Sequence, residues 1–323
     1  MSMRHVKNKN QIIRIIRDNI VRRGTPIYLS RWARLGWLEG LNVDGEGKYL
    51  FFTGLMYQMT PYIEGLISRL SRLNKSILLD IGSRLNRLID ISRLFSKVDG
   101  DRVRHAHHII RSIYLLLVNS GIDVYYKPGL DMYAGTLLHD FGLEDDLSIY
   151  ANKVYRRLEE GGVKRVVTID PHTTYMLKEV YPKYIDGYSL EVYPYIDLIK
   201  ASNGHVDNKN DSIYVIHDPC YYARALKKSV IYRDILKGYG IKYVEPRFAR
   251  LETYCCGGPI ESLSPEFSAN IASRRLEMLR ETGADKVVVL CPICLANLRR
   301  AAGHQDYILD FSEILASYTR DKS

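Results

Sequence analysis

The first 219 residues of this 323-residue chain contain no cysteine, and apolar runs long enough to span a membrane are absent throughout. The longest apolar runs, such as 113–118, fall far short of the ~20 residues that a transmembrane helix needs. The amino-terminal segment lacks the apolar core of a signal peptide. We therefore expect a cytoplasmic protein without direct membrane insertion, peripheral to a membrane only through a partner.

Nucleotide-binding signatures are also absent. No Gly-x-Gly-x-x-Gly follows a predicted strand and no Walker sequence occurs, which argues against NAD, flavin or ATP as a ligand. The formal net charge is +9, but no recognised nucleic-acid-binding motif accompanies it. We interpret the basic residues as a solvated surface and expect no nucleic-acid partner, while an acidic protein partner stays open.

An internal repeat is the main feature of the chain's organisation. Four apolar runs in one half match four in the other: 49–55 with 213–220, 122–128 with 241–246, 164–171 with 285–292, and 191–200 with 307–316. Helical periodicity lies between them, at 60–73, 147–160 and 265–281. Strands that alternate with helices indicate βαβ units. The predicted fold class is α/β, with two Rossmann-like pseudo-repeat halves, each a small parallel sheet flanked by helices.

The repeat also predicts the domain boundaries. An amino-terminal helical arm covers 1–47, the first half covers 48–201, and the second half covers 212–323, with a polar linker between the halves. The first half carries an extra stretch at about 75–119 that we interpret as a helical insert. In the arm, an apolar stripe of helical spacing predicts packing on the body of the protein, at Ile12, Ile13, Ile16 and Ile20.

All five cysteines lie in the second half, in three clusters: Cys220, the pair Cys255 and Cys256, and the pair Cys291 and Cys294. We expect each cluster just beyond a strand, in the crevice where open α/β sheets place their sites. Pro292 indicates a helix start. The three-residue spacing of the last pair then puts both sulfurs at the first turn, where the helix dipole favours thiolate over thiol.

Gly257 and Gly258 follow the middle cysteine pair. Both are expected to tolerate positive φ and to let the backbone approach a large inorganic ligand. Thiols gathered in this way in a reducing compartment usually serve a metal or a redox reaction rather than a structural disulfide.

Counting ligands separates the candidate metals. Structural zinc and an ordinary iron–sulfur cube take four protein ligands each, which would leave one cysteine idle. Five converging thiolates fit a larger cluster, or one with an exchangeable site. Two smaller alternatives remain open: a thioredoxin-type pair of Cys291 and Cys294, and a strained disulfide between Cys255 and Cys256.

The cysteine pattern resembles that of the cysteine-rich CCG-domain family. This family includes the B-type and D-type components of heterodisulfide reductase and the iron–sulfur subunits of glycolate, lactate and glycerol-3-phosphate oxidoreductases. Its motif is a cysteine, a gap, Cys-Cys-Gly, a similar gap, and Cys-x-x-Cys; here both gaps are 34 residues long. The sequence His-Asp-Pro-Cys from His217 to Cys220, with Arg224 following, also matches family usage.

The resemblance implies one non-cubane [4Fe–4S] cluster per chain, held by Cys220, Cys255, Cys256, Cys291 and Cys294. It implies an oxidoreductase subunit of a heterodisulfide-reductase-like complex that transfers electrons and reduces a disulfide at the cluster. A flavoprotein or a ferredoxin-type iron–sulfur subunit would be its partner, and a disulfide or thiol its substrate. The alternatives are a zinc-stabilised, non-catalytic assembly subunit and an iron–sulfur subunit of a glycolate, lactate or glycerol-3-phosphate oxidoreductase.

His217 is the candidate catalytic residue because it lies three residues before Cys220. It would hydrogen-bond a cluster sulfur or give a proton to the substrate, and a purely structural role stays open.

The first half departs from the family, which usually has a second CCG motif there. Every matching cysteine is replaced, by Leu55, Tyr133, Ala134, Asp170 and Thr173, while Gly54, Gly135 and Pro171 persist. Asp170, His172 and His139 are a weaker zinc candidate. We expect Asp170 to cap the following helix instead.

Overall fold

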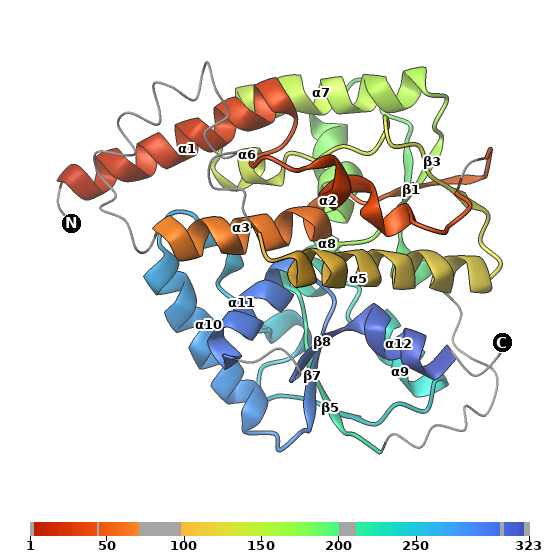
Figure 1. The fold of residues 1–323 in the computed structure, drawn as a ribbon, viewed down its shortest axis with the longest axis vertical. Helices are drawn as coiled ribbons and strands as arrows, with labels where there is room; N and C mark the ends of the chain where they lie inside the picture. Colours follow the sequence, from red (N-terminus) through yellow and green to blue (C-terminus); the bar gives the residue numbers. More distant parts are fainter. Residues whose placement is uncertain (1–2, 44, 71–97, 200–210, 304–306, 320–323) are drawn as a thin grey trace.

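The protein contains two four-stranded sheets, and every strand pair in both is parallel. The computed structural model describes residues 3–43, 45–70, 98–199, 211–303 and 307–319. Helices flank each sheet, and the two sheets lie in different halves of the molecule (Figure 1). The predicted α/β class with two Rossmann-like halves is confirmed.

The two sheets have equivalent strand orders. The first, β2-β1-β3-β4, consists of β1 (Tyr49–Phe52), β2 (Val124–Tyr125), β3 (Arg165–Thr168) and β4 (Glu191–Pro194). The second, β6-β5-β7-β8, consists of β5 (Tyr214–His217), β6 (Tyr243–Val244), β7 (Lys286–Val289) and β8 (Ile308–Asp310). Leu50 pairs with Val166 as Val215 pairs with Val287. Five residues further on, Leu55 therefore occupies the position of Cys220, as the repeat predicts.

The helical connections also correspond. In the first half, the first two strands are joined through α3 (Met56–Leu70) and α5 (Gly100–Asn119). In the second half, they are joined through the π-helical turn η6 (Tyr221–Ala225) and α9 (Ile231–Gly238). In the first half, α6 (Thr136–Asp140) and α7 (Glu144–Glu160) precede the third strand. In the second half, the third strand is preceded by the 3-10 turns η7 (Arg250–Glu252) and η8 (Gly258–Ile260) and by α10 (Pro265–Arg280). After it come α8 (Pro171–Tyr175), η3 (Met176–Val180) and η4 (Tyr181–Lys183), and in the second half α11 (Pro292–Ala302). The last strands lead into η5 (Tyr195–Asp197) and α12 (Phe311–Thr319).

The predicted helical insert at about 75–119 falls partly outside the described residues. Its described end is α5, which joins the first two strands of its sheet as α9 does in the second half. The carboxyl end of α5 therefore has a counterpart in the second half, although it lies within the stretch that we predicted to be extra in the first half.

The amino-terminal arm consists of α1 (Met3–Arg23), α2 (Arg31–Leu35) and η1 (Gly36–Leu38), and it packs on the first half (Figure 1). The side chain of Ile20 is fully buried, as its stripe predicts. The guanidinium of Arg17 in α1 donates two hydrogen bonds, of 2.5 and 2.6 Å, to the carboxylate of Asp146 in α7. Trp37 is also fully buried, so the arm contributes to the core.

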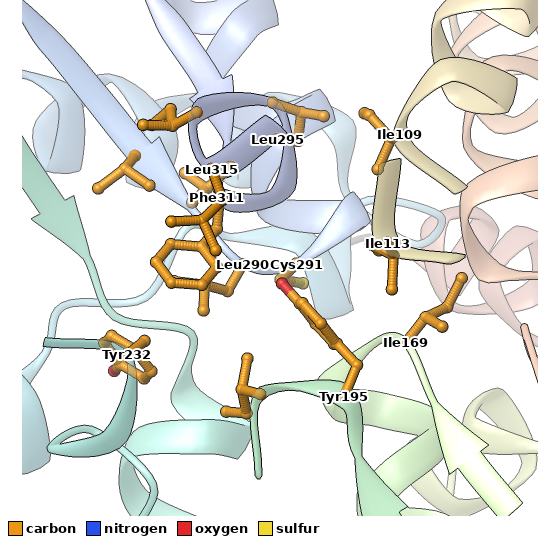
Figure 2. Close-up of a cluster of buried hydrophobic side chains, with 14 of the residues drawn as sticks. Ile109, Ile113, Ile169, Tyr195, Tyr232, Leu290, Cys291, Leu295, Phe311 and Leu315 are labelled. Carbon is orange, nitrogen blue, oxygen red and sulfur yellow. The ribbon is translucent and has the colours of Figure 1, made fainter. Parts of the chain in front are cut away.

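One hydrophobic core joins the two halves. Helix α3 packs against α11 and α5 packs against α12, so first-half helices cover second-half helices. Figure 2 shows Ile113, Ile169 and Tyr195 of the first half around Cys291, and the hydroxyl end of Tyr195 points toward that cysteine. The Tyr57 hydroxyl donates a 2.6 Å hydrogen bond to Asp310 across the same boundary. No helix in the described parts of the chain is both long and apolar enough to cross a membrane.

Candidate metal centre

The carboxyl ends of β5 and β7 bring two of the cysteine segments together. These strands are parallel neighbours, so the chain leaves both at the same edge of the sheet. Cys220 follows β5 and begins the turn η6, while Cys291 follows β7 and begins α11. The backbone N–H of Cys294 donates to the sulfur of Cys291 at 3.5 Å. Both sulfurs of this pair thus lie at the first turn of the helix, as predicted.

Cys255 and Cys256 reach the same edge differently. They follow the turn η7 in a loop well past β6, so the expectation of a position just beyond a strand is wrong for this pair. Gly257 has a left-handed φ of +83°, and a Cβ there would lie 2.6 Å from the backbone oxygen of Ser268. Gly258 does not have the expected positive φ. It is required for space, because a Cβ there would lie 2.1 Å from Cγ2 of Ile293.

The five sulfurs converge into one chain of hydrogen-bonding contacts. It runs in the order Cys220, Cys255, Cys256, Cys294, Cys291. All five are free thiols, of which three are buried and two, Cys220 and Cys255, are half-buried. A cavity of about 10 Å³ is lined by four of them, all except Cys255, and by residues of both halves, including Pro171, His172, Tyr221 and Ile293. The side of the site nearest to solvent is therefore the side of Cys220 and Cys255.

Ionisation is unevenly distributed among these thiols. Hydrogen bonds from Cys220 and Cys256 lower the pKa of Cys255 to about 2. Burial opposes ionisation of Cys291, but hydrogen bonds from Cys294 and His172, together with attraction to His172, lower its pKa to about 5. Hydrogen bonds to neighbouring cysteines, together with burial, raise the pKa of Cys220, Cys256 and Cys294. The site thus favours thiolate, the form that binds metals, at two positions.

His217 is the last residue of β5 and is 1% exposed. The Nε of Arg275 donates to its Nδ1 at 3.1 Å, so the proton of the neutral ring lies on Nε2. Nε2 has no hydrogen-bond partner among the described residues. One ring nitrogen lies within 4.8 Å of the sulfurs of Cys256 and Cys294. Burial, together with the nearby charge of Arg275, lowers the pKa of His217 to about 3, so its ring is neutral near pH 7.

Arg275 of α10 is a buried cation beside the thiols, and the sequence interpretation missed it. It is 0% exposed, its Nη1 donates to the carbonyl of Phe248 at 2.9 Å, and its Nη2 has no partner in the part of the chain that the structure describes. Burial lowers its pKa to about 10, so it stays charged near neutral pH. Buried charges need counter-charges, and Asp218, the carboxylate whose charge acts on Arg275, already forms an ion pair with Arg233. The one signal available from the sequence was an arginine on the apolar face of a helix, beside Ala272, Leu276 and Leu279.

His172, in the first half, also reaches the thiols. Its Nδ1 lies 3.8 Å from the sulfur of Cys291 and 3.5 Å from Oδ1 of Asp170. Its ring packs edge-on against the ring of Tyr221, with centroids 4.8 Å apart. Asp170 caps α8 by accepting from two backbone N–H groups, as predicted. His139 packs instead against Tyr175, and among the described residues the proposed zinc trio does not converge.

Comparison with known proteins agrees with this geometry. Residues 214–299 match the family model CCG, a cysteine-rich domain. The chain is 27% identical over 229 residues to a probable iron-sulfur-binding oxidoreductase, FadF, of Bacillus subtilis, an alignment that covers 67% of this chain. It is 26% identical over 265 residues, 74% of its length, to a probable membrane-anchored ferredoxin of Chromohalobacter salexigens. It is 27% identical over 142 residues, 43% of its length, to one of the subunits of a fumarate reductase (CoM/CoB) of Methanothermobacter marburgensis.

The chain spans only part of these relatives, since the matched regions are 32%, 39% and 28% of their respective lengths. The family match encloses the strands and helices that position the thiols, from β5 to most of α11. All five converging cysteines lie inside it. Residues 214–299 of this chain are therefore similar to the cysteine-rich domain of the CCG family.

Proposed function

We propose that this protein is an iron–sulfur redox subunit of a larger oxidoreductase and that it holds one cluster in its second half. The ligands would be Cys220, Cys255, Cys256, Cys291 and Cys294. The observation that carries the proposal is the convergence of five free thiols, from three separate segments, at the end of one parallel sheet. The names of two relatives, an iron-sulfur-binding oxidoreductase and a fumarate reductase component, support it.

The residues around the thiols fit such a group. Thiolates are soft ligands that select iron–sulfur clusters or zinc. A cluster held by thiolates is an anionic group, and the buried guanidinium of Arg275 supplies a counter-charge on one side. The ring of His217, one nitrogen of which lies within 4.8 Å of the sulfurs of Cys256 and Cys294, has at Nε2 a hydrogen-bond donor with no partner among the described residues. Five thiolates exceed the four that zinc or a simple cube requires, which favours a non-cubane [4Fe–4S] cluster.

When bound, the cluster would supply one-electron redox chemistry. The residues of the chain would fix its position, set its potential and exclude water from its buried side, where Cys256, Cys291 and Cys294 lie. The half-buried side at Cys220 and Cys255 is where a disulfide substrate or an electron-donating partner would approach. We propose a flavoprotein or ferredoxin-type partner and a disulfide or thiol substrate, as in heterodisulfide-reductase-like complexes.

A zinc-stabilised assembly subunit is the second candidate. The grouping of a ring nitrogen of His217 with the sulfurs of Cys256 and Cys294, all within 4.8 Å of one another, favours it. Zinc takes four ligands at a structural site, and one further cysteine would complete such a set.

Metal and sulfide analysis of the anaerobically purified chain separates these functions. The iron–sulfur proposal predicts about four irons per chain, an equal amount of acid-labile sulfide and broad visible absorption, as expected of a [4Fe–4S] cluster. A colourless protein with a single zinc and no sulfide would reject it in favour of the assembly function.

A further inference from the structure

We infer that the half without cysteines completes the metal centre, with His172 as a hydrogen-bond donor to the sulfur of Cys291. The inference rests on the proposed function, because it concerns the same site. It adds a positioning residue from a half of the chain that has lost every cysteine of its own motif. The two halves would then form one composite site at their boundary.

The placement of His172 identifies the donor. Its Nδ1 faces the sulfur of Cys291 at 3.8 Å and Oδ1 of Asp170 at 3.5 Å. The Asp170 carboxylate oxygen already accepts from two backbone N–H groups, and the Cys291 sulfur accepts from the N–H of Cys294. Because both neighbours act as acceptors, the hydrogen shared with them belongs to Nδ1.

The surroundings hold the His172 ring in place. It is only 6% exposed, and α8, which carries it, packs against the turn η6 that follows Cys220. The ring of Tyr221 in that turn packs edge-on against the imidazole, and the Tyr221 hydroxyl donates at 2.7 Å to Asp140 of the first half. The turn that carries one thiol is thus tied to the first half at two points, and the imidazole is fixed toward another thiol.

The repeat explains why this contact comes from the first half. His172 occupies the position that Ile293 has in the second half, immediately after a capping residue and a proline. Both side chains line the cavity among the sulfurs. A polar ring in place of an aliphatic side chain at this position therefore puts a donor opposite the cysteines.

A hydrogen bond to a ligand sulfur raises the reduction potential of an iron–sulfur cluster, because it stabilises the more negative, reduced state. Two variants isolate this contact. His172→Phe keeps a ring against Tyr221 but has no donor, whereas the amide nitrogen of His172→Asn can take the place of Nδ1. His139→Phe is the matched control, since His139 packs against Tyr175 and has no contact with a cysteine among the described residues.

The readout is a redox titration followed by electron paramagnetic resonance, together with iron content. We expect wild-type iron content in all variants and a lower midpoint potential in His172→Phe. The shift should be equivalent to about a tenfold change in the one-electron equilibrium, ~59 mV. His172→Asn should restore most of the potential, and His139→Phe should match the wild type.

Two other outcomes would overturn the inference, and a third would overturn the proposed function. Equal potentials in His172→Phe and wild type, with a normal cluster in both, would overturn the inference and leave the proposed function intact. Loss of iron from both His172 variants would also overturn it, because a hydrogen-bond donor alone is not required to retain a cluster. A wild-type protein without iron would instead overturn the proposed function itself.

Discussion

The two halves share a fold but differ in what stands at the ends of their strands. Gly135 and Gly257 have almost the same left-handed φ, +80° and +83°, and Asp170 and Cys291 both cap a helix that begins with proline. In the second half these positions direct thiols to one point, whereas in the first half the corresponding side chains fill the space. A Cβ on Gly54, for example, would lie 2.0 Å from Oγ1 of Thr173. The framework is therefore independent of the cysteines, and the candidate metal chemistry is an addition to it.

A second difference concerns a buried carboxylate at the carboxyl end of the first strand of each half. It is Asp131, which contacts the residues after β1, in the first half and Asp218, which directly follows β5, in the second. In the first half, Asp131 accepts hydrogen bonds from the backbone and hydroxyl of Thr53, from the backbone of Gly54 and from the hydroxyl of Tyr126, all neutral donors. Burial raises the pKa of Asp131 to about 6. In the second half, Asp218 accepts two hydrogen bonds from Arg233, of 2.7 and 3.0 Å. Burial opposes its ionisation, but Arg233 holds the pKa of Asp218 below its usual value.

The largest expected effect is on iron content, when equivalent residues of the two halves are substituted. Cys294→Ser should remove most of the bound iron, because it deletes a buried sulfur ligand at a point where three sulfurs meet. Thr173→Ser changes the equivalent residue of the first half and should leave the iron content unchanged. Iron and sulfide assays on anaerobically purified variants measure both. Equal iron loss in the two variants would contradict the separation of framework from metal chemistry.

The next effect compares the buried carboxylates. Asp218→Asn should lower the free energy of unfolding by about 3–5 kcal/mol near pH 7, because it breaks a buried ion pair. Asp131→Asn should change it by only about 1 kcal/mol, since its donors are neutral and the hydroxyls of Thr53 and Tyr126 can accept from an amide. Urea unfolding of the reduced, metal-free protein measures both values. A larger loss for Asp131→Asn would show that the two sites are not as different as their partners indicate.

The pH dependence of stability gives a smaller contrast. Asp131 has a pKa of about 6 when folded, against an ordinary value of 3.8, so the folded state binds an extra proton between these values. Its contribution to stability should therefore decline as pH rises from about 4 to 6, by about 2–3 kcal/mol in total. Asp218 has a lowered pKa, so its contribution is present above pH 4 and is lost as pH falls below it.

Urea unfolding of wild type, Asp131→Asn and Asp218→Asn from about pH 2 to about pH 7 tests both signs. The stability of Asp131→Asn relative to wild type should improve as pH rises, because the wild type alone carries the cost of ionising Asp131. An unchanged difference across this range would contradict the raised pKa.

The smallest expected effect concerns the matched glycines. Alanine at either position is strained by about 1 kcal/mol, because φ is positive at both. Gly257→Ala should cost more than Gly135→Ala, since its Cβ would lie 2.6 Å from a backbone oxygen whereas that of Gly135 would lie 3.0 Å from a carbon of the Tyr150 ring. Comparison of the two free energies of unfolding provides the test, and equal costs would show that the loop before α10 adjusts freely.

Local patterns in the sequence were sufficient to predict much of this structure. Each of the eight strands in the described parts of the chain lies in an apolar run that the repeat identified, and Pro292 marked the start of α11 correctly. The spacing of the cysteines, with two gaps of 34 residues, indicated their convergence. These features depend on residues close in sequence or on a pattern repeated along the chain.

Contacts between residues far apart in the sequence could not be predicted in the same way. His172 and Cys291 are 119 residues apart, and only the packing of α8 against η6 brings them together. Arg275 reaches His217 from α10, and its burial follows from the orientation of that helix against β5. The role of Gly258 depends on the closeness of Ile293. All three depend on tertiary placement rather than on local pattern.

Native mass spectrometry of the anaerobically purified chain tests most directly whether the five converging thiols hold one iron–sulfur cluster. The proposal predicts a single species whose added mass corresponds to one [4Fe–4S] unit in the wild type, and the bare chain for Cys294→Ser. A wild-type chain that carries one zinc ion, or no metal at all, would contradict it.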